Sequence, residues 1–173
     1  MRMLRNAFGL ILVFCLFQTA TAVKSRSPEP KCKENLGLPG TVAAALKKVP
    51  DVFVSCRLEP FVLKGDFDGD GRPDYAVLVT QQRSGDRGVL IVFAGSRKLV
   101  IGAGRPVEYG AGPSADLGFR QWQLYPKSRP VESAPDQPIL KLRGDALLVG
   151  DPDGASGLFY WNGKKIRWYQ QGD

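Results

Sequence analysis

The residues with the clearest chemical potential lie in one short acidic segment, GDFDGDGRPDYAVLV, at residues 65–79. Four aspartates stand at positions 1, 3, 5 and 9 of a tight loop, and they are Asp66, Asp68, Asp70 and Asp74. Carboxylates crowded so closely repel one another when the loop is empty, and a hard cation with oxygen ligands removes that penalty. Glycines between the aspartates give the backbone the freedom that such a loop needs. The spacing therefore predicts a metal site.

Calcium is the cation that this pattern favours, because Ca²⁺ takes about six to eight oxygen ligands. The four Asp side chains and the backbone carbonyl of Arg72 at position 7 are the expected protein ligands, and water or a bidentate carboxylate can supply the others. Mg²⁺ fits less well because it requires a stricter octahedron. The loop is not an EF-hand, since Pro73 stands at position 8 and Val77 replaces the bidentate Glu at position 12. The alternative is a solvated Asp/Gly turn that holds no metal.

The order D-x-D-G-D-G-x-x-D followed by a hydrophobic residue resembles the calcium loop of FG-GAP and VCBS-type repeats, as in integrin-type propeller blades. The resemblance covers roughly residues 61–95 and implies a calcium loop between two antiparallel strands. It implies as ligands Asp66, Asp68, Asp70, Asp74 and the backbone of Arg72, with Tyr75 opening the following strand.

The chain has only one full copy of this motif. Residues 151–154, Asp-Pro-Asp-Gly, repeat a fragment of it, and we interpret them as a turn. Because a propeller has at least about four blades, we expect a single blade-like hairpin and not a full propeller. The remainder of the chain resembles small bacterial exported proteins, and that resemblance implies no activity.

Composition excludes several catalytic classes. The chain has no His, which excludes Ser-His-Asp and Cys-His catalysis and His-ligated zinc, and its three Cys are too few for a four-Cys zinc site. Glu108 and Asp116, in a Gly-rich segment, are candidates for the carboxylate pair of a glycoside hydrolase. Acids in loops are usually just solvated. We therefore predict a protein that is not an enzyme, with an Asp/Glu-based hydrolase as an alternative.

The end of the chain, GLFYWNGKKIRWY, is typical of a β-hairpin around Asn162-Gly163, the pair favoured in two-residue type I′ turns. Such a turn pairs Trp161 with Lys164. The face expected to pack on the core carries Phe159, Trp161, Ile166 and Trp168. The face expected to meet solvent carries Leu158, Tyr160, Lys165 and Arg167. Tyr160, Lys165 and Arg167 are a candidate surface for a glycan or an anionic head group, and the alternative is an ordinary packed hairpin with a charged outer face.

Residues 1–22, MRMLRNAFGLILVFCLFQTATA, have the pattern of a secretory signal peptide. Arg2 and Arg5 precede the apolar run at residues 8–17, which is too short for a membrane-spanning helix of roughly 20 residues. We expect cleavage after Ala22 and a periplasmic or secreted protein without a stable membrane span; the alternative is an uncleaved anchor. Export disfavours nucleic acid as a partner.

Cleavage would remove Cys15 and leave Cys32 and Cys56. Two cysteines in an exported chain predict one disulfide bond, with two free thiols as the alternative. Cleavage also removes two Arg and no acid, so the formal charge falls from +7 to +5. This mild basicity is consistent with ordinary solubility.

Most of the remaining chain has the composition of β-strands. We expect a linker at residues 23–36 and a single calcium-binding β domain at residues 37–173. A helix is predicted to begin at Thr41 as its N-cap and to end before Pro50. The runs at 75–80 and 89–93 are apolar on both faces, which predicts central strands covered on both sides. Further strands are expected at 53–58, 61–63, 99–101, 119–125, 139–142 and 146–149, and a loop at 102–118.

The predicted fold class is therefore mainly β (α+β), an antiparallel meander or β-sandwich-like sheet with one short N-terminal helix. The functional hypothesis is an exported, non-enzymatic calcium-binding domain in which Ca²⁺ stabilises the strand–loop–strand unit. The alternative is an envelope protein-binding or inhibitor module with structural calcium, whose partner is an envelope protein or a glycan.

Overall fold

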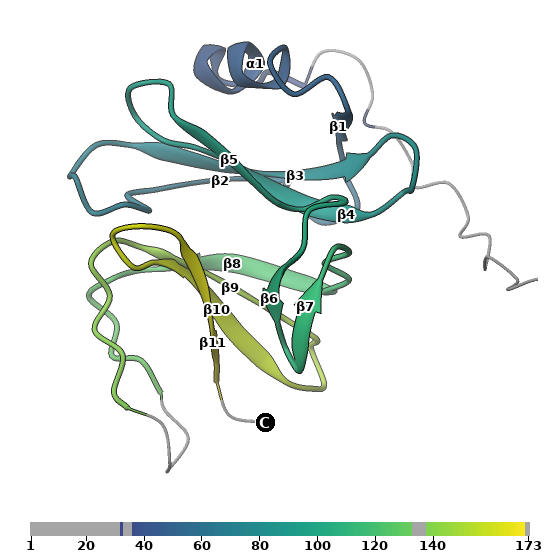
Figure 1. Ribbon diagram of the computed structural model, residues 1–173. Coiled ribbons are helices and arrows are strands. Elements are labelled where there is room, and N and C mark those ends of the chain that lie inside the picture. Colours follow the sequence, from purple (N-terminus) through teal and green to yellow (C-terminus); the bar gives the residue numbers. More distant parts are fainter. Residues whose placement is uncertain (1–31, 33–35, 133–137, 172–173) are drawn as a thin grey trace, which may run out of the picture.

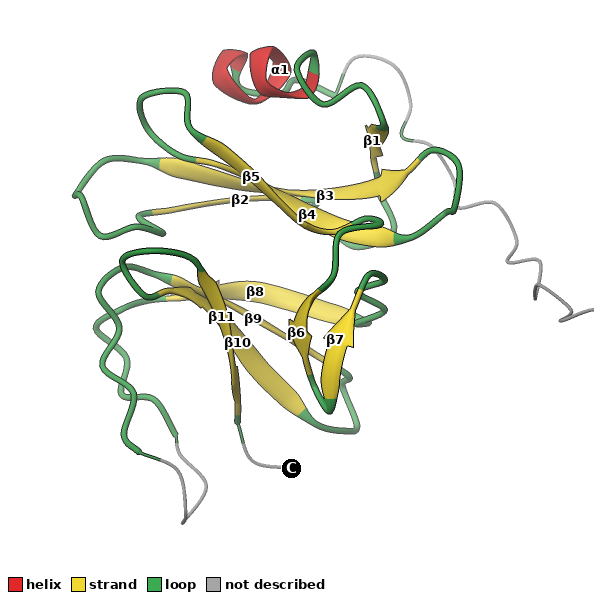
Figure 2. Ribbon diagram, in the orientation of Figure 1, coloured by secondary structure: helices red, strands yellow, loops and turns green. Residues whose placement is uncertain are grey.

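The computed structural model describes residues 32, 36–132 and 138–171 (Figure 1). The predicted signal peptide and most of the predicted linker lie outside these residues. Two antiparallel sheets stack face to face, and one short helix covers the outer surface of the first sheet (Figure 2). The predicted mainly-β, sandwich-like class with a single short helix among the described residues is confirmed.

The first sheet contains five strands, and β3 (Asp74–Gln81) is its centre. One edge of β3 pairs with β4 (Arg87–Val92), which in turn pairs with β5 (Lys98–Gly102). The other edge pairs with β1 (Val52–Val54) and, further along, with β2 (Val62–Gly65). Nearly every residue of β3 and β4 is buried, as their two apolar faces predict.

The second sheet is an antiparallel meander of four strands that follow one another in the chain. Its strands are β8 (Gln121–Tyr125), β9 (Ala146–Gly150), β10 (Ser156–Trp161) and β11 (Ile166–Gln170). A two-stranded ribbon, formed by β6 (Val107–Tyr109) and β7 (Gly112–Ser114), lies beside the second sheet (Figure 1). Tyr109 of this ribbon contacts the rings of Phe159 and Trp168.

The main hydrophobic core lies between the two sheets. Inward-facing side chains of both sheets form one cluster, which includes Ala76, Leu78, Val89, Ile91, Trp122, Leu147, Val149 and Phe159. A second cluster fills the opposite side of the first sheet, where Val42 and Ala45 of α1 (Gly40–Leu46) pack on Val77, Val79 and Leu90. This helix explains why β3 and β4 are apolar on both faces.

Several local predictions were wrong, including the strand expected at 53–58, of which only the part up to Val54 forms β1. The helix begins at Gly40 after Pro39, and Thr41 lies within its first turn instead of capping it. Residues 139–142 form no strand, and Ile139 is 78% exposed. The Gly- and Pro-rich segment at 102–118, expected to be a loop, contains β6 and β7. Pro113 is accommodated because a two-stranded ribbon leaves one side of each strand without a ladder partner.

The terminal hairpin has a different register from the predicted one. Trp161 pairs with Ile166, not Lys164, so four residues and not two connect the strands. The side chain of Asn162 accepts hydrogen bonds from the backbone N–H groups of Lys164 and Lys165, which closes the longer turn. A shift of two residues keeps every side chain on its face, so Phe159 and Ile166 still pack in the core.

The opposite face of that hairpin is not open to solvent throughout. Leu158 is fully buried in a third cluster with Tyr125 and Ala146, against which Leu142 packs from the preceding segment. The expectation that this whole face meets solvent is therefore wrong at Leu158. Val131 and Leu142, both from the segment between β8 and β9, pack against this cluster and supply the apolar cover.

The predicted disulfide is confirmed: Cys32 and Cys56 are bonded, with Cα atoms 5.3 Å apart. The bond links Cys32, in the segment before α1, to Cys56, which lies two residues after the end of β1. Because it encloses a loop with a sequence separation of 24, the chain-entropy model assigns it about 3.5 kcal/mol.

We predict that replacing both cysteines by serine lowers the free energy of unfolding by about 3.5 kcal/mol, because the unfolded chain gains freedom. Urea unfolding of the two proteins measures the difference. A reducing agent should lower the midpoint of the wild type and leave the double variant unchanged. Equal midpoints for both proteins would contradict the prediction.

Candidate metal centre

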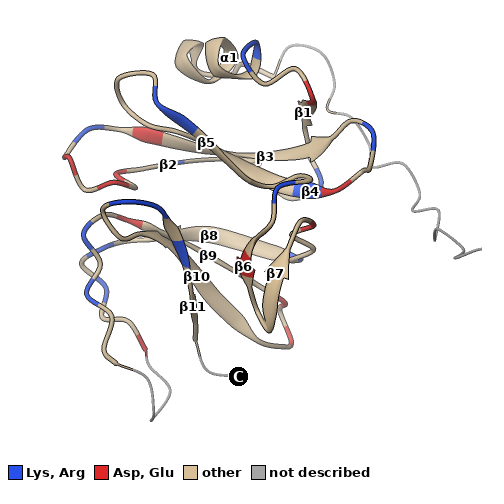
Figure 3. Cartoon of the chain, in the orientation of Figure 1, with Lys and Arg blue, Asp and Glu red and all other residues tan. Residues whose placement is uncertain are grey.

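The acidic loop connects β2 to β3 at one end of the first sheet. Gly65 at the end of β2 pairs with Asp74 at the start of β3, so the eight residues between them form a closed hairpin loop. Figure 3 shows the acidic residues gathered at this end, with basic residues on the neighbouring loops of the second sheet. The loop therefore lies between two antiparallel strands, as the resemblance implies.

Three of the predicted ligands converge. Asp66, Asp68 and Asp74 each offer a carboxylate oxygen, and these oxygens lie within 4.8 Å of one another. Asp70 is outside this group; its side chain is exposed, and its Oδ1 accepts a hydrogen bond of 2.8 Å from the N–H of Arg72. The backbone role predicted for Arg72 and the ligand role of Asp70 stay predictions.

Asp74 is the fully buried member of the group, and backbone groups surround its carboxylate. One oxygen accepts the N–H groups of Phe67 at 2.9 Å and Asp68 at 3.4 Å, and the other accepts the N–H of Ala94 at 2.7 Å. Burial raises the pKa of Asp74, and the negative charge of Asp68 adds to the rise, although these hydrogen bonds oppose it. Asp74 thus fixes both the loop and the turn after β4.

Asp66 carries the least satisfied oxygen in the loop. Its Oδ2 accepts a hydrogen bond of 2.8 Å from Nζ of Lys127, while its Oδ1 is buried and has no hydrogen-bond partner. Burial favours a raised pKa of Asp66, but Lys127 and the nearby backbone N–H groups of Gly71 and Gly69 outweigh it and leave the pKa below its ordinary value; neither of these N–H groups makes a full hydrogen bond to Oδ1. A buried carboxylate oxygen without a partner is the kind of group that a cation would satisfy.

Asp68 is held by Arg97, a residue of the turn between β4 and β5. Nη2 of Arg97 lies 2.6 Å from Oδ2 of Asp68. The other oxygen of Asp68 accepts a weak hydrogen bond of 3.3 Å from the N–H of Asp70. Arg97 and Lys127 therefore place two positive charges against the acidic loop from outside it.

A turn of the second sheet clamps the loop. The N–H of Asp145 donates to the carbonyl of Asp66 at 2.7 Å, and Oδ2 of Asp145 accepts the N–H of Asp66 at 2.9 Å. The other oxygen of Asp145 accepts the N–H of Lys127. Gly69 and Gly144 allow the two backbones to touch, because a Cβ atom on either glycine would overlap the other segment. The turn at residues 143–145 is therefore part of the site.

Sequence reasoning missed Arg97, Lys127 and Asp145 because they lie far from the loop in the chain. The sequence Arg143-Gly144-Asp145 is typical of a turn, but nothing in it indicates contact with the acidic loop.

A salt bridge explains the position of one candidate catalytic acid. Asp116 binds Nη2 of Arg87 at 2.7 Å and accepts the N–H of the same residue, which anchors the segment before β8.

The remaining candidates are spread over the surface. Glu108 is exposed on β6, and Lys165 and Arg167 are exposed on the terminal hairpin. Tyr160 pairs across the hairpin with Arg167 and is partly buried against the third hydrophobic cluster.

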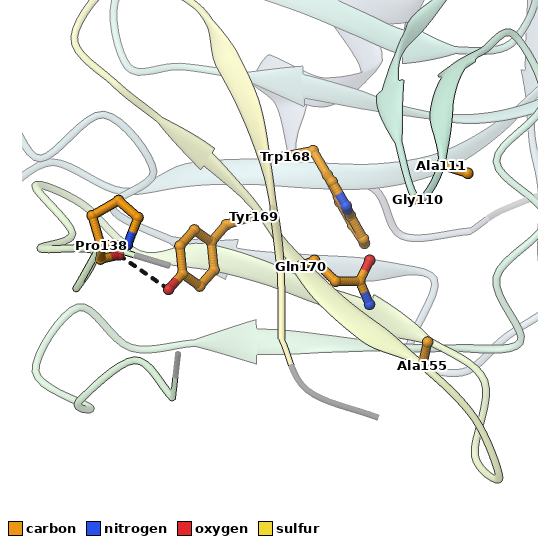
Figure 4. Close-up of a pocket in the computed structure, with 7 residues that line it drawn as sticks. All are labelled: Gly110, Ala111, Pro138, Ala155, Trp168, Tyr169 and Gln170. Atoms are coloured by element: carbon orange, nitrogen blue, oxygen red, sulfur yellow. Dashed lines mark hydrogen bonds between the residues drawn. The ribbon is translucent and has the colours of Figure 1, made fainter. Parts of the chain in front are cut away.

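A separate, open pocket of about 730 Å³ lies beside β11 (Figure 4). Its walls include Trp168, Tyr169 and Gln170 of β11 and Gly110 and Ala111 at the tip of the β6–β7 ribbon. The hydroxyl of Tyr169 donates to the carbonyl of Pro138 at 3.2 Å on one side. No carboxylate is among the described residues that line it, so this pocket does not provide the paired acids of a glycoside hydrolase.

Within the described residues, no helix has the length and apolar character that a membrane crossing requires. No protein-family model, curated protein or solved structure matches the chain.

Proposed function

We propose that this chain is an exported, non-enzymatic β-sandwich domain that binds a calcium ion in the loop at residues 66–74. The observation that supports the proposal is the group formed by Asp66, Asp68 and Asp74, whose oxygens lie within 4.8 Å of one another. The buried Oδ1 of Asp66, which has no hydrogen-bond partner, adds to this support. Carboxylate oxygens are the ligands that calcium prefers.

The role of the ion is stabilisation. Calcium offsets the mutual repulsion of the aspartates and the cost of burying the Asp74 carboxylate. Because the loop is clamped by the turn at 143–145, an ion in the loop stabilises the contact between the two sheets as well as the β2–β3 hairpin. The fully folded chain binds the ion and the unfolded chain does not, so binding adds to the free energy of unfolding.

The disulfide between Cys32 and Cys56 supports an oxidising compartment, and we place the protein in the periplasm or outside the cell. The signal-peptide pattern at residues 1–22 supports the same location. Calcium is available in such compartments, so a site of modest affinity would be occupied there.

We predict that calcium raises the melting temperature of the mature protein by roughly 5–10 °C when its concentration is a hundred times the dissociation constant. Circular dichroism scans with millimolar CaCl₂ and with a chelator measure the shift. D68A should lose the shift, because it removes a central oxygen donor. D153A, which removes an exposed aspartate elsewhere, should keep it.

The calorimetric result decides the proposal. Titration of calcium into chelator-treated protein should release or absorb heat with one site per chain. If wild-type protein shows neither heat nor a change in melting temperature at millimolar calcium, the proposed function is wrong.

A further inference from the structure

We propose that Arg97 is an internal counter-ion that competes with calcium for Asp68 and thereby sets the affinity of the loop for the ion. The inference rests on the proposed function and concerns the regulation of the same site. Arg97 lies outside the loop, and it sets the calcium concentration at which the loop is half occupied.

The first support is the ion pair itself. Nη2 of Arg97 lies 2.6 Å from Oδ2 of Asp68; the Asp68 side chain is 13% exposed and that of Arg97 is 47% exposed. Water therefore screens the Asp68 end of this pair less than it screens a fully exposed carboxylate. The turn that carries Arg97 is held at the loop independently, because the N–H of Ala94 donates to Asp74 at 2.7 Å. The backbone of this turn therefore positions Arg97 next to the aspartates.

The second support is aromatic packing of the guanidinium. Cζ of Arg97 lies 3.9 Å from the ring centroid of Phe93 and 4.6 Å from that of Trp161. The two rings also contact each other, with centroids 5.5 Å apart. Stacking on aromatic rings restrains the planar guanidinium, so less entropy is lost in holding Asp68. Trp161 is the last residue of β10, so Arg97 touches both sheets.

Electrostatics gives the direction of the effect. A divalent ion bound to Asp66, Asp68 and Asp74 is close to the guanidinium charge, and like charges at such a separation repel. Calcium competes for the Asp68 carboxylate, so Arg97 loses its ion pair with Asp68 when the ion binds, and its remaining positive charge nearby repels the ion. Both effects oppose calcium binding. Lys127 opposes calcium binding at Asp66 in the same way. Among the described residues no aromatic ring contacts its ammonium group, so we expect Arg97 to have the larger effect.

The test compares the calcium affinity of R97Q with that of the wild type by calorimetry at low ionic strength. We expect R97Q to bind calcium about three to ten times more tightly, because one positive charge near the ion is removed. R83Q is the matched control. It removes the same charge from an exposed position in the turn between β3 and β4, and its affinity should equal that of the wild type.

Tryptophan emission provides a second measurement that does not depend on the folding of R97Q. Calcium should draw Asp68 away from Arg97, which changes the contact of the guanidinium with the ring of Trp161. Wild-type emission should therefore change on calcium addition, and W161F, which retains Trp122 and Trp168, should lose most of the change.

The outcomes separate this inference from the proposed function. If the wild type binds no calcium, both are overturned. If the wild type binds calcium but R97Q binds it equally or more weakly, only the counter-ion role is overturned. If R97Q does not fold, the emission of the wild type decides instead. Calcium binding without any change in that emission overturns the role of Arg97.

Discussion

Replacing Gly144 with alanine should lower the free energy of unfolding by at least about 3 kcal/mol, the upper range for overpacking. A Cβ atom at this position would lie 2.6 Å from the nitrogen of Gly69 and 2.7 Å from the carbonyl oxygen of Phe67. Both are backbone atoms of the acidic loop, so no flexible side chain can move aside. The expected fall in melting temperature is roughly 6–12 °C, measured by circular dichroism with a chelator present.

The matched control is G112A in β7. A Cβ atom on Gly112 meets no atom within 4 Å, so this variant should melt within about 2 °C of the wild type, as surface substitutions usually do. G144A should also lose most of its response to calcium, because the turn at 143–145 holds the backbone of Asp66. If G144A melts like G112A, the backbone of the turn at 143–145 does not lie against the backbone of the acidic loop.

The second large effect is expected at Asp74. Its carboxylate is the acceptor for the N–H groups of Phe67, Asp68 and Ala94. D74A leaves these donors without their partner, at about 1–3 kcal/mol for each one that stays buried. Removal of a buried charge recovers part of this, as the raised pKa of Asp74 indicates. We therefore expect a net loss of about 2–5 kcal/mol in metal-free protein.

Asp70 provides the comparison, because it belongs to the same motif but is exposed. Urea unfolding in a chelator should show that D70A loses no more than about 1 kcal/mol, the value of its single hydrogen bond to Arg72. D74N retains one oxygen acceptor and should fall between D74A and the wild type. Equal stability of D74A and D70A would show that the Asp74 hydrogen bonds do not organise the loop.

The strands with the strongest sequence signal were predictable because their signal arises from burial. Residues 75–80 and 89–93 are apolar at successive positions, and the structure places an apolar cluster on each side of them. Residues 102–118 carry the opposite local signal, because Gly and Pro disfavour strands. The β6–β7 ribbon forms there because Tyr109 packs on the aromatic rings of the second sheet, a tertiary contact that the local sequence does not report.

The candidate site likewise has one part that the sequence predicts and another part that it does not. The aspartates are neighbours in the sequence, so their spacing alone predicts that they converge in a tight loop. Arg97, Lys127 and Asp145 reach the loop from 29 residues beyond Asp68 and from 61 and 79 residues beyond Asp66. No local pattern marks them, since each is an ordinary charged residue in a turn or loop. The charge balance of the loop is therefore a property of the tertiary structure.

The clamp between Asp66 and Asp145 has a consequence for the order of assembly. During synthesis the acidic loop emerges long before the residues that hold it, since 79 positions separate the two partners. Contacts of such long range close late, after the loop-closure entropy between them has been overcome. A cation bound in the loop would stabilise the β2–β3 hairpin, and most strongly those molecules in which the turn of Asp145 already holds the backbone of Asp66. The largest effect of the ion would therefore come late in folding, after the two sheets have docked.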